Sequence, residues 1–555
     1  MRYFNIDNEL KAYAVAGTQT VLLSLEINKN LVAGKGFMGF KIGRKEGNGK
    51  PVLLNGTKRF ASDDPVNPEQ KLSPLQTYLW KDYTADPGKT YTYTFEAMFG
   101  TWDKMSPGYS TSLKVTTEQL NESEHSVFFN FGVTGCQAYA KIFPKKKVED
   151  LSEPEMKKAL SILGRELFTD GLLKFVAQAD SDNYKLLGAF YELEYPPFLV
   201  ALKKAENKGA TVKIIYSGRP DQTKANEEAL TNAGLMSVSI KRNYQVAQPH
   251  NKFMVLLDKN DRPLQVWTGS TNITIRGIFG HSNTGHWVKN EKIAKKYLTY
   301  WNMLATNPSK ADFTTLTDSI QKDIDGKKLI KGTKVIFCPR KTDALLKEFV
   351  NLMDSANTAV CIIYPFNIEK IFKDFYASDR SYLRFIITDK GGDKNEVITN
   401  DKDVIKTQGA VLDTAVEQWV KEMTSKTTTG AGTLYVHNKF FIVDPLSTSP
   451  VVVTGSANFS DESLTKNDEN MLIIKGDKRV ADIYFTEFSR MFDHFMPRYL
   501  QKLKEEKNSD HSFSYAGFSK PLDEEGTWYK DYYDKEKLVC KRKKMFIKMK
   551  GAIRG

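Results

Sequence analysis

Two kinds of hydrophobic pattern divide the chain near residue 145. Before this point, short runs alternate apolar and polar positions, and turn-forming segments such as Gly47-Asn48-Gly49 and Asp86-Pro87-Gly88 separate them. Alternation with a period of two predicts strands that bury one face. The alternating runs are residues 21–27, 37–42, 91–99 and 112–115. Several short strands at this spacing predict an antiparallel β-sandwich over residues 1–145.

From residue 146 onward, continuous apolar runs alternate with helical patterns. The first series is a strand at 186–191, a helix at 197–207 and a strand at 211–216; the second is a strand at 359–364, a helix at 369–376 and a strand at 383–388. This alternation favours mixed or parallel sheets that are covered by helices. We therefore predict two similar α/β halves, at 146–325 and 326–505, followed by a C-terminal tail at 506–555.

The two predicted halves carry the same short motif. His250-Asn251-Lys252-Phe253-Met254-Val255 returns as His437-Asn438-Lys439-Phe440-Phe441-Ile442, and each copy precedes a Thr-Gly-Ser-x-Asn segment, at 268–272 and 454–458. Two copies in the same order indicate an internal duplication.

The residue types of the repeat suggest its chemistry. At the start of a strand, the His and the Lys project to one face because the strand period is two, and the intervening Asn points the other way. The Gly-Ser-x-Asn segment adds small residues with hydroxyl and amide donors. Two halves brought face to face would surround a tetrahedral anion with donors and place one imidazole on either side. This arrangement suits in-line displacement at phosphorus.

At these residues the chain resembles the phospholipase D superfamily, in which an H-x-K-x4-D motif followed by Gly-Ser-x-Asn occurs twice. The second copy matches in full and contains the acid that the family commonly has further on: His437, Lys439, Asp444, Gly455, Ser456, Asn458 and Glu469. The first copy departs from the pattern. Leu257 stands at the place of the Asp, Asp258 comes one position late, and the segment around Asn283 lacks the later acid. These departures concern how the first imidazole is oriented.

The resemblance implies a role for each residue of the motif. His250 would be the nucleophile that forms a phosphohistidine, and His437 the general acid. The phosphate-binding set would be Lys252, Lys439, Ser270, Asn272, Ser456 and Asn458, and the orienting acids Asp444 and Glu469. This scheme requires neither a metal nor a cofactor.

One further resemblance, in the N-terminal region, and two acidic residues near the motif add to this prediction. The segment Leu79 to Tyr93 looks like fibronectin type III or immunoglobulin-like modules, which bind or position something; a packing module that shields the α/β halves fits equally well. Glu192 and Glu194 follow a predicted strand at the same edge as the motif. They either reach the cleft or form a solvated strand end.

The charge of the chain bears on its substrate. A formal net charge of +13 implies a field that attracts polyanions, whether nucleic acid or an anionic membrane surface. The tail segment Lys541 to Lys550 interleaves cations with apolar residues, which suits a lipid interface or a nucleic-acid backbone, although a solvated basic tail is the commoner case. Two motif copies in one chain favour a phospholipid as substrate, and the basic composition makes a nuclease the alternative. A non-catalytic protein that binds a phosphoryl ligand is the third hypothesis, against which the retention of two imidazoles argues.

The remaining composition bears on the compartment. Four scattered cysteines, at 136, 338, 361 and 540, show neither zinc-ligand spacing nor a disulfide framework. The first residues lack an apolar stretch of signal-peptide length, and no run of 18 or more apolar residues occurs. We expect a cytoplasmic protein, and signal-independent secretion also fits. A duplicated chain closes its own site, so the sequence leaves the oligomeric state open.

Overall fold

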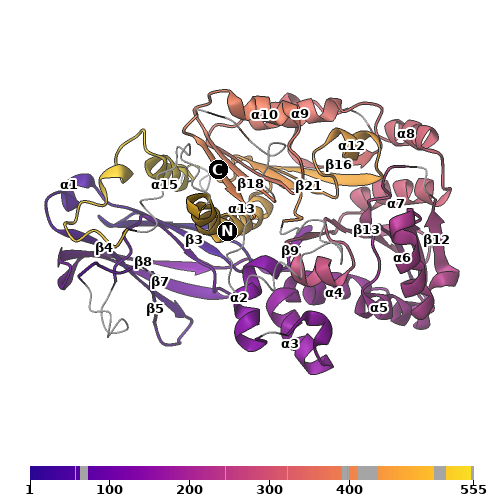
Figure 1. Ribbon diagram of the computed structural model, residues 1–555, viewed down its shortest axis with the longest axis horizontal. Helices are drawn as coiled ribbons and strands as arrows, with labels where there is room; N and C mark the ends of the chain where they lie inside the picture. Colours follow the sequence, from indigo (N-terminus) through magenta and orange to yellow (C-terminus); the bar gives the residue numbers. More distant parts are fainter. Residues whose placement is uncertain are drawn as a thin grey trace.

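The computed structural model describes residues 1–549 apart from 57, 63–72, 145, 244–245, 322, 390–396, 398, 400, 410–435 and 506–519, together with residue 551. The described chain forms an N-terminal pair of antiparallel sheets and two seven-stranded halves (Figure 1). The two halves lie one above the other on the right of Figure 1, and the N-terminal sheets lie on the left.

The N-terminal region consists of two four-stranded antiparallel sheets. The first has the order β1-β2-β3-β6 and the second β5-β4-β7-β8. Their strands are β1 (Arg2–Asn5), β2 (Lys11–Ala16), β3 (Val21–Glu26), β4 (Phe37–Glu46), β5 (Val52–Leu54), β6 (Leu79–Asp82), β7 (Thr90–Thr101) and β8 (Lys104–Thr116). All four predicted runs are strands here. Side chains of both sheets share one hydrophobic core, as their alternating pattern requires.

The first half is built on a seven-stranded mixed sheet of order β12-β11-β10-β13-β14-β15-β9. Its strands are β9 (His125–Phe129), β10 (Tyr184–Phe190), β11 (Thr211–Ser217), β12 (Ser239–Arg242), β13 (Lys252–Asp258), β14 (Pro263–Gly269) and β15 (Thr284–Val288). Strand β9 precedes residue 145, yet it pairs antiparallel with β15. All five of its residues are buried, so it lacks the alternation of the sandwich strands.

The second half repeats this plan with a sheet of order β16-β22-β21-β20-β17-β18-β19. Its strands are β16 (Gly332–Cys338), β17 (Ala359–Tyr364), β18 (Leu383–Thr388), β19 (Val404–Gln408), β20 (Phe440–Val443), β21 (Val451–Gly455) and β22 (Glu469–Lys475). In both halves a parallel pair, β10 with β11 and β17 with β18, stands beside the motif strand, β13 or β20. The predicted strands at 359–364 and 383–388 match β17 and β18 in both bounds.

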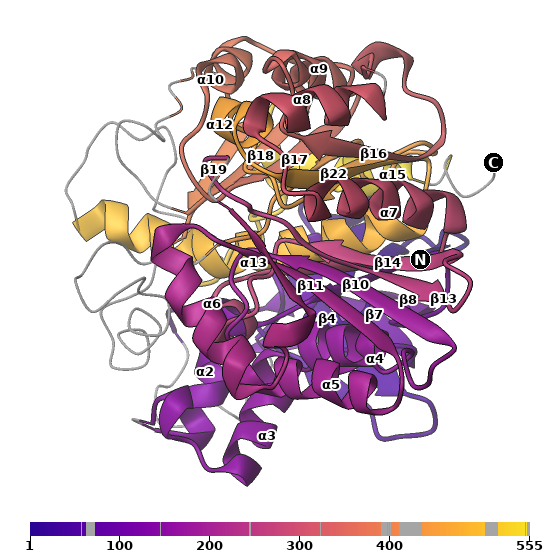
Figure 2. The same cartoon turned by 90° about the vertical axis from the view of Figure 1, so that its right-hand side faces the viewer.

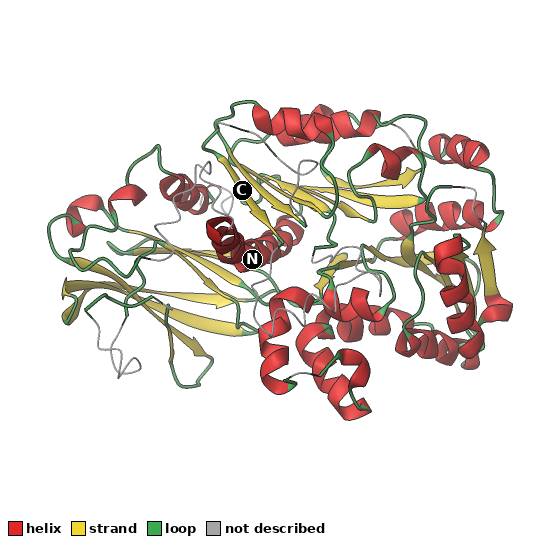
Figure 3. Ribbon diagram, in the orientation of Figure 1, coloured by secondary structure: helices red, strands yellow, loops and turns green. Residues whose placement is uncertain are grey.

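Helices cover the outer faces of the two sheets and fill the space between them (Figures 2 and 3). The α-helices are α1 (Lys29–Val32), α2 (Gly132–Ile142), α3 (Glu153–Leu163), α4 (Leu173–Val176), α5 (Pro196–Asn207), α6 (Pro220–Asn232), α7 (Glu291–Ala305), α8 (Lys310–Ser319), α9 (Ala344–Asp354), α10 (Lys370–Ala377), α12 (Asp461–Thr465), α13 (Lys478–Glu505) and α15 (Leu538–Lys548). Side chains of α7 and α13 join both sheets in one core between the halves. Each sheet is therefore buried on both faces, which explains the continuous apolar runs of its strands.

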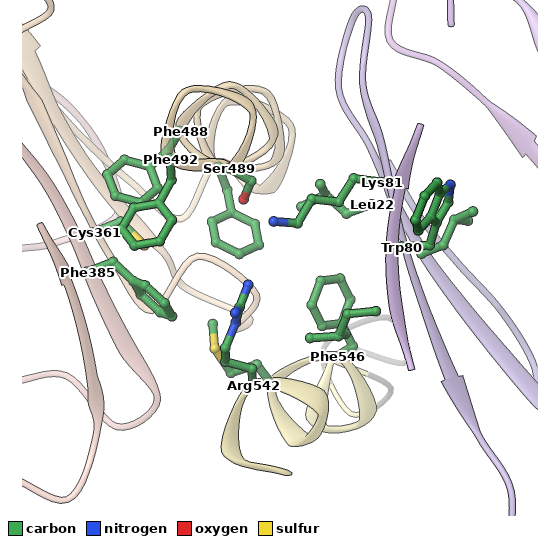
Figure 4. A pocket seen from close by; sticks show the side chains of 14 residues that line it. Leu22, Trp80, Lys81, Cys361, Phe385, Phe488, Ser489, Phe492, Arg542 and Phe546 are labelled. Carbon is green, nitrogen blue, oxygen red and sulfur yellow. The ribbon is translucent and has the colours of Figure 1, made fainter. Parts of the chain in front are cut away.

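The basic segment near the C-terminus does not project from the protein. It forms α15, which packs between the N-terminal sheets and the second half, and it lines a small apolar cavity of about 40 Å³ with Trp80, Phe385 and Phe492 (Figure 4). Met545 and Phe546 of α15 are buried. The apolar side chains that the sequence offered for a lipid interface thus face the protein core. No helix in the described part of the chain is long and apolar enough to cross a membrane.

Candidate active site

The two motif copies lie at the N-terminal ends of equivalent central strands. His250 and Asn251 directly precede β13, and His437 to Lys439 directly precede β20. Both strands are buried in the middle of their sheets, so the residues at their start stand on a rigid support. The structure brings His250 and His437 into the lining of one cleft between the halves, with a volume of about 890 Å³.

Reciprocal hydrogen bonds connect the two halves at the N-terminal ends of these strands. The backbone N–H of His250 donates to the carbonyl of Asp468 at 3.0 Å, and the N–H of His437 donates to the carbonyl of Ser282 at 3.0 Å. The Asn of each motif points away from its neighbours, as predicted, and reaches the other half. Asn251 Oδ1 accepts from Asn470 at 2.8 Å, and Asn438 Nδ2 donates to Thr284 at 2.8 Å. The duplication therefore forms an internal pseudo-dimer.

Each imidazole is oriented by a side chain of the opposite half. His250 Nδ1 lies 2.9 and 3.0 Å from the two carboxylate oxygens of Glu469, which begins β22. His437 Nδ1 lies 2.9 Å from Oδ1 of Asn283, which precedes β15. With Nδ1 engaged, Nε2 is the ring nitrogen that remains for a ligand in the cleft.

Asn283 in the first half is therefore equivalent in position to Glu469 in the second half. The sequence suggested that the missing acid would affect the first imidazole. Because the partners are exchanged between the halves, the carboxylate serves His250 and the neutral amide serves His437. The Asn283 amide is itself fixed, since its oxygen also accepts from Ser270 at 2.9 Å and its nitrogen donates to Gly277 at 2.9 Å.

Burial favours the neutral form of both imidazoles. Desolvation lowers the pKa of His250 to about 4, although the adjacent Glu469 carboxylate opposes the shift. Desolvation, with the charge of Lys439, holds the pKa of His437 well below its ordinary value. Burial alone would raise the pKa of Glu469, but His250 and Lys252 lower it, so this carboxyl is charged. A neutral His250 hydrogen-bonded to a carboxylate carries a free lone pair on Nε2.

The two motif lysines lie buried beneath the histidines. Lys252 Nζ donates to the carbonyl of His250 at 2.7 Å, and Lys439 Nζ donates to that of His437 at 2.8 Å. An aromatic ring covers each ammonium, Tyr191 at 5.2 Å and Phe366 at 5.8 Å from the ring centroid. Desolvation lowers the pKa of Lys252 to about 8. The sequence did not single out these two rings as site residues, although Tyr191 is the last residue of the predicted strand that pairs with β13, and Phe366 lies two residues after the one that pairs with β20.

The Gly-Ser-x-Asn segments follow β14 and β21. A side chain at Gly269 or Gly455 would meet the carbonyl oxygen of Thr284 or Asn470 at 2.1 and 2.3 Å, so only glycine fits. The serine hydroxyls accept from backbone N–H groups of the neighbouring strand, Ser270 from Thr284 and Ser456 from Asn470, both at 3.0 Å.

The other two residues of this predicted phosphate-binding set, Asn272 and Asn458, line the cleft itself. Asn272 donates its Nδ2 to Glu192. A role of the four serine and asparagine side chains in phosphate binding stays a prediction.

Asp444 lies at the far end of β20 from His437. Its carboxylate accepts hydrogen bonds of 2.7 to 3.1 Å from the backbone N–H groups of residues 357–359, and one of 2.8 Å from the Thr358 hydroxyl. With a rise of about 3.3 Å per residue, the strand separates this carboxylate from the imidazole by roughly 20 Å. The structure therefore places Asp444 where it caps the loop before β17 and does not contact the ring that it was expected to orient. Asp258 similarly accepts from the N–H groups of Asn260 and Arg262 in the turn after β13.

The cleft around the histidines is lined by side chains of both halves. It includes the two carboxylates that the sequence left open, Glu192 and Glu194, and the aromatic rings of Tyr191 and Phe366. Tyr191 packs edge-on against His250 with 5.0 Å between the ring centroids. No group of three His, Cys, Asp or Glu side chains within the described ranges is placed to hold a metal ion.

A protein-family model matches parts of both halves of this chain. A family model described as cardiolipin synthase, PLD-like domain, matches residues 175–304 and 349–492. The mitochondrial cardiolipin hydrolases of Homo sapiens and Canis lupus familiaris are 38% and 36% identical over 63 residues, 11% of this chain. The match spans 23% of the length of these relatives.

Two solved structures are also similar. Polyphosphate kinase from Porphyromonas gingivalis has a TM-score of 0.39 and 11% identity, covering 70% of this chain and 52% of that one. Nuc from Salmonella typhimurium, a phospholipase D family member, has a TM-score of 0.20 and 25% identity, covering 24% of this chain and 82% of its own. Both TM-scores lie below 0.5, too low to establish a shared fold over the whole chain. The two segments matched by the family model nevertheless coincide with the two halves that supply His250 and His437, and the chain therefore contains a phospholipase D-like domain.

Proposed function

We propose that this protein is a phosphodiesterase that works through a phosphohistidine intermediate without a metal ion, and that its substrate is a phospholipid. The observation that carries the proposal is the exchange of partners at the cleft. Each half contributes an imidazole whose Nδ1 is fixed by the other half, so two Nε2 atoms are available to one ligand. The family model and the shared segment with the cardiolipin hydrolases support the same reaction class.

The unequal partners support His250 as the nucleophile and His437 as the general acid. The Nε2 lone pair of His250 attacks phosphorus, an N–P bond forms, and the ester P–O bond breaks. His250 then carries positive charge, which the adjacent Glu469 carboxylate stabilises. His437 gives its Nε2 proton to the leaving oxygen, and its neutral partner Asn283 makes it the stronger acid of the two. His437 acquires this proton when the substrate binds, because the negative charge of the phosphodiester favours the protonated imidazole.

The second step reverses the path. Water or an alcohol enters on the side of His437, which now accepts the proton of the entering oxygen as a general base. A new P–O bond forms, the N–P bond breaks, and His250 is released. The buried Lys252 and Lys439 stabilise the charge on the non-bridging oxygens throughout.

A nuclease is the second candidate, favoured by the net charge of +13. We rank it below the phospholipid because the positive charge is not concentrated at the cleft. Six carboxylates and two arginines line it: Glu149, Glu192, Glu194, Asp221, Glu369 and Glu462, with Arg219 and Arg276. A nucleic-acid channel is expected to be lined by Lys and Arg that follow the phosphate backbone.

The decisive experiment measures turnover in the presence of a chelator. We would assay bis-p-nitrophenyl phosphate, mixed phospholipid vesicles, and single- and double-stranded DNA and RNA. Head-group release from vesicles alone is the expected result, whereas degraded nucleic acid with intact lipid would make the protein a nuclease. Turnover that needs added metal ions, or none on any substrate, would refute the proposal; the latter would favour a non-catalytic binding protein.

A trapping experiment tests the roles of the histidines. In the His437→Asn variant, a substrate is expected to leave a phosphoryl adduct on His250, detected by mass spectrometry of acid-protected digests. An adduct on His437 in the reciprocal His250→Asn variant would reverse the assignment. His494→Asn is the matched control, because His494 lies on α13 outside the cleft and Nε2 of this buried ring has no hydrogen-bond partner in the structure.

A further inference from the structure

The charge of the cleft is opposite to that of the whole chain. Arg219 forms an ion pair with Asp221 at 2.9 Å, and Arg276 lies close enough to Glu194 to oppose the rise in the pKa of that carboxyl caused by burial. Both arginines of the lining thus lie near carboxylates, and because six carboxylates outnumber two arginines, the charged side chains of the lining sum to a negative charge. Lys252 and Lys439 lie beneath the histidines, where the charges of both Glu469 and Glu192 act on Lys252.

Two residues that line the same cleft carry buried acceptor atoms. Asn272 is 8% exposed and Asn467 2% exposed, both line the cleft, and the Oδ1 atom of each has no hydrogen-bond partner in the structure. Their nitrogens are engaged, since Asn272 donates to Glu192 and Asn467 donates to Glu469 at 3.2 Å. A buried acceptor without a donor carries a free-energy cost, which a bound donor would relieve.

These acceptors lie on the His250 side of the cleft. Glu192 follows Tyr191, whose ring packs on His250, and the backbone of Glu192 accepts from the N–H of Ile273 at 3.0 Å, which places it beside Asn272. Asn467 reaches the same side because it shares the Glu469 carboxylate with His250. The wall beside the nucleophile thus presents carboxylate and amide oxygens.

The chemistry of this wall selects one class of ligand group. Phosphate oxygens would be repelled, so a flanking phosphate of DNA or a second phosphate of a lipid is disfavoured. A metal ion would need a cluster of three or more ligating side chains, and none occurs in the described part of the chain. A quaternary ammonium binds best in an aromatic cage, whereas the rings of Tyr191 and Phe366 in the lining already cover Lys252 and Lys439. A primary ammonium, with three N–H donors, matches oxygen acceptors.

We propose that Glu192 and Asn272 form a subsite for the primary ammonium group of a zwitterionic phosphodiester of the ethanolamine type, held while its phosphorus lies between His250 and His437. This rests on the proposed phosphodiesterase function and names its substrate class. The Asn272 amide then serves the ammonium rather than the phosphate. The subsite distinguishes the substrate from cardiolipin-like and nucleic-acid polyanions.

The test compares soluble diesters that differ in one group. We would measure kcat/KM for glycerophosphoethanolamine, glycerophosphocholine and glycerophosphoglycerol in chelator. A charge-assisted hydrogen bond predicts a preference for the ethanolamine ester of about tenfold or more. Glu192→Gln keeps the shape but removes the charge, and is expected to reduce this preference to within about twofold. Glu462→Gln is the matched control, because it removes a carboxylate of the same cleft from the second half. Equal kcat/KM for the three esters, or a preference that survives Glu192→Gln, would overturn the subsite.

A second readout separates this inference from the proposed function. Bis-p-nitrophenyl phosphate lacks an ammonium, so its His250-dependent turnover together with equal use of the three glycerophosphodiesters would leave the function standing and remove the subsite. If no diester is turned over, calorimetric binding of glycerophosphoethanolamine decides. Binding that is stronger than that of glycerophosphoglycerol and is lost in Glu192→Gln supports the subsite without catalysis, and its absence refutes it.

Discussion

The contact between Glu469 and His250 gives the sharpest prediction about catalysis. Glu469 is fully buried, and both of its carboxylate oxygens lie within 3.0 Å of His250 Nδ1. Glu469→Gln preserves the size of the side chain and removes the charge. The imidazole keeps a hydrogen-bond partner, but the positive charge that develops on phosphorylated His250 loses its counter-ion.

The magnitude follows from this geometry. A hydrogen bond to a charged partner contributes about 1.5–3 kcal/mol, so kcat is expected to fall roughly 10- to 150-fold. The pH profile changes as well. The Glu469 carboxylate raises the pKa of Lys252, which is about 8, and that of His250, which is about 4. Without it both pKa values fall. The alkaline limb of kcat/KM, where Lys252 loses its charge, therefore moves below pH 8.

The assay is kcat/KM against pH for the wild type and the variant, with thermal unfolding to verify the fold. Glu487→Gln is the control, because Glu487 is also a buried carboxylate but pairs with Arg490 on α13, away from the cleft. A change in kcat of less than about twofold, or an alkaline limb that stays in place, would refute the reasoning that Glu469 acts through charge.

Two other substitutions separate orientation from folding. In Asn283→Asp, a carboxylate beside His437 is expected to raise the pKa of that imidazole by about 1–3 units, measured by NMR titration; an unchanged pKa would contradict the contact with Asn283. In Asp444→Asn, which tolerates the φ of +49° at this position, the lost charge-assisted hydrogen bonds to residues 357–359 are expected to lower the free energy of unfolding by about 1–3 kcal/mol in urea denaturation. The kcat of this variant should stay within about twofold, and a collapse of kcat at unchanged stability would show that Asp444 orients His437 after all.

The local pattern predicted the elements well where burial is uniform. The strands at 359–364 and 383–388 match β17 and β18, because a continuous apolar run has few ways to be buried other than as a central strand. The same logic failed for the tail. The cations of 541–550 suggested an exposed or membrane-bound segment, but Lys541 pairs with Asp403 at 2.7 Å and Lys543 lies over the ring of Tyr533 at 4.2 Å. Asp403 is more than 100 residues away from Lys541, and Tyr533 is 10 residues away from Lys543. No local sequence pattern predicts either contact.

The sequence alone determined the duplication, the two motif histidines and lysines, and the α/β character of both halves, since these depend on residue types and on short-range periodicity. The tertiary structure decided which side chain holds which imidazole. The sequence indicated Glu469 as an orienting acid of the second copy and showed that the segment at Asn283 lacks such an acid, but it did not show that Glu469 contacts His250 and Asn283 contacts His437 across the interface. The tertiary structure also decided that an overall basic chain has an acidic cleft. The histidine contacts join residues about 150 to 220 positions apart, and the cleft is lined by residues of both halves, so only the packing of one half against the other creates these two properties.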